Sequence, residues 1–108
     1  MGLMVIAAYR PKPGKKDDLL AVVREHMPTL RRQGLVTDRA AVTMEARDGT
    51  IVEVFEWKSS DAVDRAHEDP VVRAMWDRFF EACECVPLAR LDESSEMFAH
   101  FAPLKVDP

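Results

Sequence analysis

Two side chains of the chain, His67 and Glu53, have the chemistry of proton transfer. His67 comes directly before Glu68-Asp69-Pro70, at the end of an expected short helix. Because imidazole changes its charge near neutral pH, His67 is a candidate general base. The alternative is a helix-terminal histidine that hydrogen-bonds a nearby carbonyl, a position that the helix dipole favours. The sequence leaves both interpretations open.

Glu53 is the single charge among the apolar side chains expected on one face of a small sheet. Loss of solvation there favours the neutral acid, which is a usual condition of catalytic carboxyl groups. Alternatively, Glu53 lies near the open end of the sheet or pairs with an arginine such as Arg24. Tyr9, at the end of the first apolar segment, either donates a hydrogen bond to a ligand or caps the sheet. We take His67, Glu53 and Tyr9 as the candidate catalytic residues.

Aromatic and apolar residues elsewhere in the chain predict a pocket for a small aromatic or apolar molecule. The expected lining residues are Trp57, Phe55, Trp76, Phe79, Met44 and His26. Aromatic residues at strand and helix spacing are also typical of an ordinary core, which is the alternative for most of this set. His26 lies two residues before Pro28 and either faces the cavity or is solvated.

Other kinds of active site find no support in the sequence. No glycine-rich phosphate loop, metal-ligand cluster or Ser-His-Asp motif is visible, so we expect no cofactor and no metal. Cys83 and Cys85 are the only cysteines. Their spacing is too tight for an unstrained disulfide, and no further cysteine completes a zinc site. We therefore expect two free, largely buried thiols.

Residues 40–57, AAVTMEARDGTIVEVFEW, predict a β-hairpin that turns at Asp48-Gly49. Asp-Gly between alternating apolar segments favours a two-residue type I′ turn. That turn places Met44 opposite Glu53 and Val42 opposite Phe55, all on one apolar face. A slip of one residue changes which side chains share a face.

The remaining pattern predicts a strand over Leu3–Arg10, buried on both faces, and a helix over about residues 15–33. Ser59-Ser60-Asp61 offer an N-cap for a short helix that runs to about His67, a second helix begins at Asp69-Pro70, and a strand spans Val86–Leu91. This order predicts an α+β fold with a ferredoxin-like βαββαβ antiparallel sheet, in which the first and third strands are central. Residues 1–108 make one domain of ordinary size. A tail, Met97–Leu104, docks on the core or reaches into a partner.

Charge and composition limit the classes of partner. The formal net charge is −4 at pH 7, and 47% of the residues are hydrophobic. Phosphate binding needs a basic surface, so we expect no nucleic acid as the main partner. The N-terminal segment, MGLMVIAAYR, lacks the basic start of a signal peptide and is too short to span a membrane. We therefore expect a cytoplasmic protein without a membrane partner.

The strand MVIAAYRPKPGK, the hairpin ending in EVFEWKSSDA and the helix AHEDPVVRAMWDRF together resemble the dimeric α/β-barrel superfamily, specifically its antibiotic biosynthesis monooxygenase-like group. The resemblance spans residues 3–91. It implies a homodimer, in which two sheets pack face to face and each protomer keeps a pocket between its sheet and its helices. The superfamily includes cofactor-independent oxygenases of polycyclic phenols, heme-degrading monooxygenases, isomerases and many proteins without an established activity.

The heme-degrading branch uses an Asn in the first strand and a Trp and a His on later helices, where this chain has Tyr9, His67 and Trp76. Without that histidine, heme cleavage is disfavoured. The resemblance instead implies a cofactor-independent monooxygenase, or a related isomerase, that acts on a small aromatic or apolar substrate, with His67 as base and Glu53 or Tyr9 assisting. The alternative is a non-catalytic homodimer that binds a small molecule. A ligand-sensing regulator is disfavoured because the chain has no helix-turn-helix.

Overall fold

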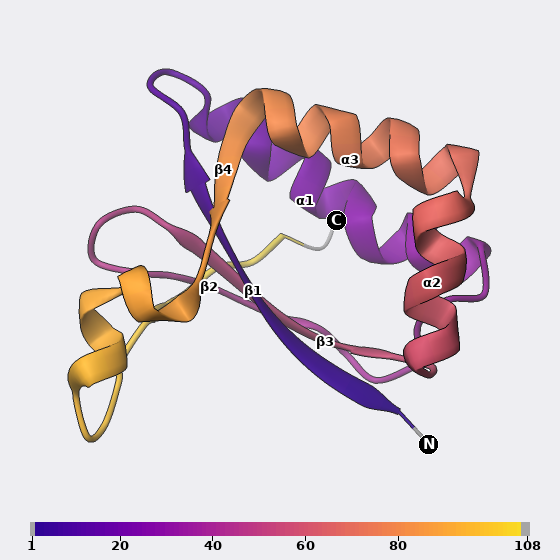
Figure 1. The fold of residues 1–108 in the computed structure, drawn as a ribbon. Coiled ribbons are helices and arrows are strands. Elements are labelled where there is room, and N and C mark those ends of the chain that lie inside the picture. The colour runs from indigo at the N-terminus through magenta and orange to yellow at the C-terminus, as the bar shows by residue number, and fades with distance from the viewer. Residues whose placement is uncertain (1, 107–108) are drawn as a thin grey trace.

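The computed structural model describes residues 2–106, so residues 1, 107 and 108 of the predicted domain lie outside it. The described residues form a five-stranded antiparallel sheet in the order β4-β1-β3-β2-β5, together with three α-helices (Figure 1). The strands are β1 Leu3–Pro11, β2 Val42–Glu45, β3 Ile51–Trp57, β4 Cys83–Val86 and β5 Ala102–Pro103. The helices are α1 Lys16–Arg32, α2 Ser60–Glu68 and α3 Pro70–Ala82. The predicted α+β class and the antiparallel sheet are confirmed.

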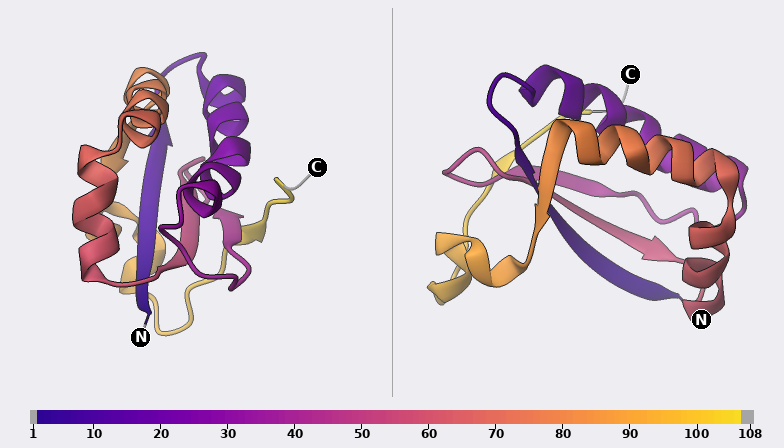
Figure 2. Two further views of the ribbon diagram at one scale, coloured as in Figure 1. Left: turned by 90° about the vertical axis from the view of Figure 1, so that its right-hand side faces the viewer. Right: turned by 45° about the horizontal axis from the view of Figure 1, so that its top comes forward.

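The helices form a layer on one face of the sheet. Helices α1 and α3 run side by side, and α2 stands at the end of the sheet near the start of β1 (Figure 2). Helices α2 and α3 each begin at a side-chain cap in a segment where the sequence predicted one. The Ser59 hydroxyl accepts the Ala62 N–H at 3.1 Å, and the Asp69 carboxylate accepts the Val71 N–H at 2.9 Å. Pro70 then occupies the first turn of α3, where no N–H is required.

The main core lies between this helix layer and the facing side of the sheet. Alternate residues of β3 face the helices, as the strand period requires: Ile51, Glu53, Phe55 and Trp57. From α1 and α3 the core receives fully buried side chains such as Leu19, Leu30 and Val72. Glu53 is thus surrounded by apolar core, as the sequence predicted, and needs polar partners there.

The predicted hairpin is present, but its register is one residue away from the expected one. Met44 pairs with Val52, and Thr43 pairs with Glu53. The predicted turn type was wrong because Gly49 alone has a positive φ, of 91°. The N–H of Gly49 donates to the carbonyl of Ala46, and the N–H of Ala46 donates to the carbonyl of Thr50, so the loop has three residues and ends in a glycine bulge.

Two strand predictions also need correction. β1 is not buried on both faces, because no helix within residues 2–106 covers its second face, where Met4 and Ile6 are 51% and 49% exposed. The last strand begins at Cys83 rather than Val86 and ends before Pro87, since proline has no N–H for the ladder. A 3-10 turn, Leu88–Arg90, follows.

The second face of the sheet is covered at one end only. A small cluster of Ala8, Ala46, Val52 and Leu91 lies there, with Phe101 packed against it. Near the hairpin turn, buried Glu93 accepts the backbone N–H of Arg47 at 2.8 Å and thereby holds the C-terminal segment against the sheet. The rest of this face leaves Val42, 52% exposed, beside Met4 and Ile6.

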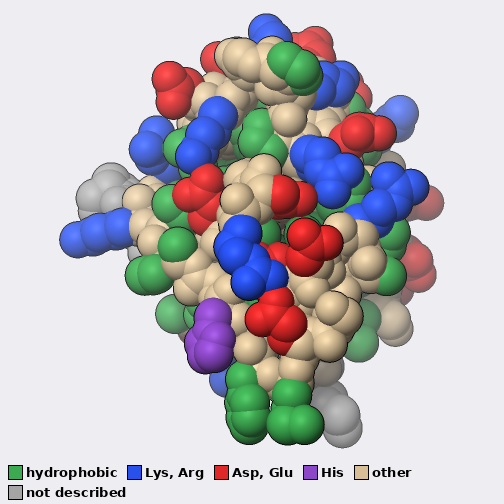
Figure 3. All heavy atoms as spheres, turned by 90° about the vertical axis from the view of Figure 1, so that its left-hand side faces the viewer, with side chains coloured by type: hydrophobic (Ala, Val, Ile, Leu, Met, Phe, Trp, Pro, Cys, Tyr) green, Lys and Arg blue, Asp and Glu red, His purple; other side chains and the backbone are tan. Residues whose placement is uncertain are grey.

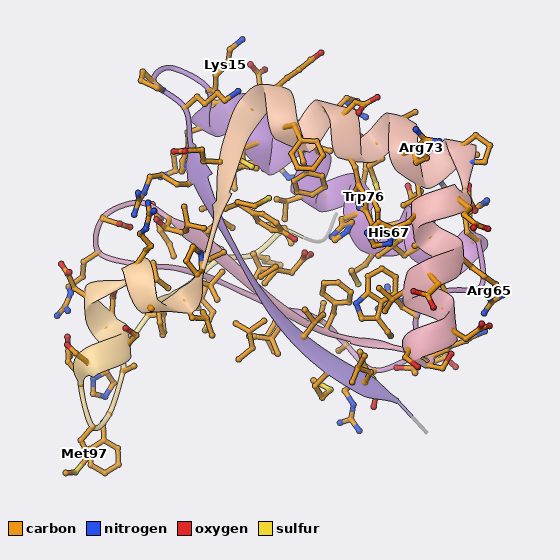
Figure 4. The ribbon with its side chains drawn as sticks, in the orientation of Figure 1. Lys15, Arg65, His67, Arg73, Trp76 and Met97 are labelled. Carbon is orange, nitrogen blue, oxygen red and sulfur yellow. The ribbon has the colours of Figure 1, made fainter. Side chains whose placement is uncertain are left out.

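The predicted tail both docks and projects. β5 pairs with β2 and adds an edge strand, and Phe101 packs on the small cluster. Met97 and Phe98 are 91% and 74% exposed, and Met97 lies at the tip of the C-terminal loop, away from the sheet (Figure 4).

The surface carries charges of both signs. On the face shown in Figure 3, basic and acidic side chains lie among one another. Near the hairpin turn, Arg10 pairs with Asp48 at 3.4 Å. None of the helices within residues 2–106 has the length and apolar character needed to cross a membrane.

Candidate functional site

A buried polar cluster joins β1, β3 and α1. The Tyr9 hydroxyl donates to Oε1 of Glu53 at 2.8 Å, and Nδ1 of His26 lies 2.7 Å from the same oxygen. Tyr9, His26 and Glu53 are 6%, 3% and 1% exposed. The carboxylate that the sequence predicted in the core therefore finds its partners in a tyrosine and a histidine, and not in Arg24.

The strand pairing makes room for this cluster. Glu53 lies between Ala7 on β1 and Thr43 on β2, and both neighbours are small. The larger side chains of Tyr9 and His26 can therefore reach over the sheet to the carboxylate. Aromatic rings fix the imidazole of His26, since the ring centroid of Phe79 lies 4.9 Å from its centroid and the centroid of Phe55 lies at 5.3 Å.

Protonation within the cluster follows from its hydrogen bonds. Burial, and then the charge of Glu53, raise the pKa of Tyr9 well above its ordinary value, so the phenol stays protonated and donates. A carboxylate can only accept, so the imidazole of His26 donates through Nδ1–H. In the neutral ring, Nε2 then carries the lone pair. Within residues 2–106, Nε2 has no hydrogen-bond partner and is not fully enclosed.

His26 opens onto a cavity of about 290 Å³ between the sheet and the helices. This volume suits one small molecule. Seven of the residues predicted from the sequence line it: Tyr9, His26, Phe55, Trp57, His67, Trp76 and Phe79. The lining is mostly apolar, and the polar groups that face the cavity are few. The cavity can therefore take a small, largely apolar molecule and present a basic nitrogen to it.

His67 lies at the mouth of this cavity beside Trp76. The two ring centroids are 5.0 Å apart in an edge-to-face arrangement, and the two side chains lie next to each other between α2 and α3 (Figure 4). Nδ1 of His67 donates to the carbonyl of Val63 at 2.8 Å. Both interpretations of this residue thus describe part of its setting, because it is a helix-terminal histidine that also lines the cavity.

The predicted placement of Met44 in the pocket is wrong. The one-residue register difference turns Met44 to the opposite face of the sheet, where it packs on the cluster around Val52. Glu53 keeps its predicted face because the alternation within β3 does not depend on the hairpin register. It also forms part of the wall of a second cavity of about 780 Å³, which Arg24 and Arg31 border.

The two cysteines differ in their surroundings. Cys83 is buried, whereas Cys85 is exposed and lines the 290 Å³ cavity, so the prediction of two buried thiols holds for Cys83 alone. A hydrogen bond from the Cys83 thiol and the nearby His26 lower the pKa of Cys85 to about 7, against the opposing effect of burial. The same contact and burial raise the pKa of Cys83.

The sequence did not indicate Cys85 as a cavity residue, because the predicted last strand begins three residues after the observed one. With a strand that begins at Cys83, Cys85 pairs with Tyr9 and shares its face. Val5, Ala7 and Phe80 complete the cavity wall. The alternation within β1 could have indicated Val5 and Ala7, which lie on the same face as Tyr9.

Comparisons with models of protein families, with curated proteins and with solved structures found no match for this chain. Within residues 2–106, no group of three or more His, Cys, Asp or Glu side chains is arranged to hold a metal ion.

Proposed function

We propose that the protein binds a small, largely apolar aromatic molecule in the 290 Å³ cavity and removes a proton from it. One observation carries this proposal. Within residues 2–106, the buried imidazole of His26 donates through Nδ1 to Glu53, its Nε2 has no hydrogen-bond partner, and the residue lines an apolar cavity. A base held by a carboxylate on its far nitrogen is a recurring arrangement for proton abstraction.

Each member of the cluster has a separate role in this proposal. His26 is the base in this proposal. The sequence had suggested His67 for this role. Glu53 is a positioning residue that fixes the tautomer of His26 and stabilises the imidazolium after proton transfer. Tyr9 holds Oε1 of Glu53 in place from the other side. His67, whose Nδ1 is engaged by Val63, offers its Nε2 to a polar group of the ligand at the cavity mouth.

Two reactions can follow deprotonation of a phenol or an acidic C–H group. In cofactor-independent monooxygenation, molecular oxygen is the oxidant. It adds to the substrate carbanion, one oxygen atom remains as a carbonyl where a CH₂ group stood, and the other leaves as water. In isomerisation, the proton returns to a different carbon and no oxidant is consumed. The geometry of His26 serves both reactions.

We further propose a cytoplasmic homodimer of the dimeric α/β-barrel type, in the antibiotic biosynthesis monooxygenase-like group. The order β4-β1-β3-β2 with all three helices on one face supports the ferredoxin-like part of this proposal. The apolar side chains of Met4, Ile6 and Val42 on the opposite face support a second sheet packed there. Two free thiols are typical of a reducing compartment.

A non-catalytic small-molecule-binding homodimer is the second candidate. It is favoured by the fact that Tyr9, His26 and Glu53 already hydrogen-bond one another, as members of a purely structural network also do. The two candidates share the cavity and its ligand, and they differ in whether the Nε2 of His26 takes up a proton.

The test is a screen of small phenols and aromatic carbon acids for binding and turnover. Binding is followed by tryptophan fluorescence, because Trp57 and Trp76 are the only tryptophans and both line the cavity. Turnover is followed by oxygen uptake and by the product mass. We expect His26→Gln to abolish turnover of a substrate and to keep binding. Binding without turnover in the unaltered protein, with and without oxygen, would establish the second candidate.

A further inference from the structure

Cys85 places a sulfur atom in the wall of the cavity. It lies on the edge strand β4, directly opposite Tyr9, and its side chain is exposed there. Cys83 lies two residues earlier on the same face of the strand. No role in the proposed proton transfer uses either thiol, so the cavity holds one reactive group that remains to be explained.

The surroundings of Cys85 favour the thiolate, which is the nucleophilic form of cysteine. The Cys83 thiol stabilises the Cys85 sulfur, and the charge of protonated His26 acts in the same direction. His26 is an independent indication of a ligand at this place, since its side chain is only 3% exposed and lines the same cavity, and its Nε2 has no hydrogen-bond partner among the residues that the structure describes. A nucleophile and an imidazole that can take up and return a proton thus line one apolar cavity.

We propose that Cys85 is a nucleophile for electrophilic aromatic ligands of this cavity, namely quinones or aryl-substituted α,β-unsaturated carbonyl compounds, which it binds as a thioether. This inference rests on the proposed function for the size and apolar aromatic character of the ligand, and it is independent of whether His26 removes a proton from a substrate.

The chemistry balances without an added oxidant or reductant. The Cys85 thiol gives its proton to the neutral imidazole of His26 or to water, and the thiolate sulfur forms a bond to the β-carbon of the ligand. The π bond between the α- and β-carbons breaks, and its electron pair moves towards the carbonyl oxygen as an enolate. The α-carbon then takes one proton, from protonated His26 or from water. The product is a thioether in which the former carbon-carbon double bond is a single bond, and the adduct of a quinone then enolises to the hydroquinone thioether.

The test uses two maleimides that differ in one group, N-phenylmaleimide and N-ethylmaleimide. Their rates are measured on Cys83→Ser, which has Cys85 as its single cysteine, and on glutathione as a free thiol. We expect one adduct, mapped to Cys85, and a phenyl-to-ethyl rate ratio about tenfold above the ratio for glutathione, since the cavity binds the ring before the bond forms. Cys85→Ser should give no such acceleration at Cys83.

Peptide mapping of the unaltered protein provides a second reading if Cys83→Ser does not fold. An adduct that forms first on Cys83, or a rate ratio equal to that of glutathione, would overturn the inference. Binding of naphthol to Cys85→Ser, followed by tryptophan fluorescence, separates this failure from that of the proposed function. If naphthol binds but the phenyl-to-ethyl rate ratio equals that of glutathione, only the proposed role of Cys85 is refuted. If naphthol does not bind either, the proposed binding of aromatic molecules in the cavity is refuted as well.

Discussion

Nδ1 of His26 lies 2.7 Å from Oε1 of Glu53, although the two residues come from a helix and a strand that are 27 positions apart in the sequence. Both side chains are buried, and the Tyr9 hydroxyl donates to the same oxygen. A buried carboxylate is costly unless donors compensate its lost hydration. The cluster therefore stabilises a buried carboxylate as well as positioning the proposed base. Substitutions in it should change both the stability of the protein and its activity.

Tyr9 is the only tyrosine, so its ionisation can be read directly from the tyrosinate absorbance of the whole protein. Burial and the charge of Glu53 raise its pKa, so the folded protein should show no tyrosinate until well above pH ~10, whereas the urea-unfolded chain should titrate near that value. A folded protein that titrates like the unfolded chain would contradict the cluster geometry.

The same shift sets the direction of the alkaline stability change. Above the ordinary tyrosine pKa, the folded state keeps a proton that the unfolded state has lost, so the contribution of Tyr9 is complete below that pH and declines as the pH rises. The expected loss in unfolding free energy approaches roughly 1.4 kcal/mol per pH unit. Urea unfolding at a series of alkaline pH values measures it, and Tyr9→Phe should lack this component.

Tyr9→Phe and Glu53→Leu should not be additive in stability. Each removes one side of the hydrogen bond between Tyr9 and Glu53, so the second change costs less once the first is present. We expect a coupling free energy of about 1 kcal/mol in a double-mutant cycle by urea unfolding. Additive changes would show that the hydroxyl and the carboxylate do not interact in solution.

Cys83→Ala should slow the alkylation of Cys85 by iodoacetamide at pH 7. Three ionisable side chains influence Cys85 or are influenced by it: Cys83 on β4, Tyr9 on β1 and His26 on α1. Without the Cys83 thiol, the pKa of Cys85 should rise from about 7 towards its ordinary value, so the thiolate fraction at pH 7 falls. We expect a rate roughly tenfold lower. If the alkylation rate of Cys85 depends on pH in the same way with and without the Cys83 thiol, Cys83 does not lower the pKa of Cys85.

Ile6→Glu should convert the proposed dimer to a monomer, because the change places a charge on the exposed apolar face of the sheet. Val71→Glu is the matched control, since Val71 is 51% exposed on α3 and Ile6 is 49% exposed on β1. Light scattering after size exclusion should give twice the chain mass for the unaltered protein and for Val71→Glu. A monomeric unaltered protein would remove the homodimer from the account.

The sequence predicted the helix caps well and the hairpin register badly, for related reasons. Ser59 and Asp69 act on N–H groups within three residues, so their local chemistry decides the result. Asp48-Gly49 is compatible with more than one loop length. The structure uses the three-residue loop, in which Asp48 accepts the N–H of Thr50 at 2.8 Å and Gly49 alone needs a positive φ.

The sequence predicted most of the residues that line the cavity, but not the hydrogen bonds that join Tyr9, His26 and Glu53. Glu53 was singled out correctly as a carboxylate within an apolar face. Its partners could not be deduced from the sequence, because His26 reaches it from a helix whose rotation about its own axis is set by packing across the whole sheet. The sequence suggested His67 as the base because it comes directly before Glu68-Asp69-Pro70, at the end of an expected short helix. His26 has no comparable signal beside it in the sequence.

The central claim, that His26 is the base of the cavity, is tested most directly with para-nitrophenol, whose absorbance reports its own ionisation. If His26 takes the phenol proton, the bound phenolate is stabilised by the imidazolium, and the ligand should ionise about one pH unit lower when bound than when free. We predict that His26→Gln loses this shift while His67→Gln retains it. A shift that survives in His26→Gln, or that is lost in His67→Gln instead, would contradict the account.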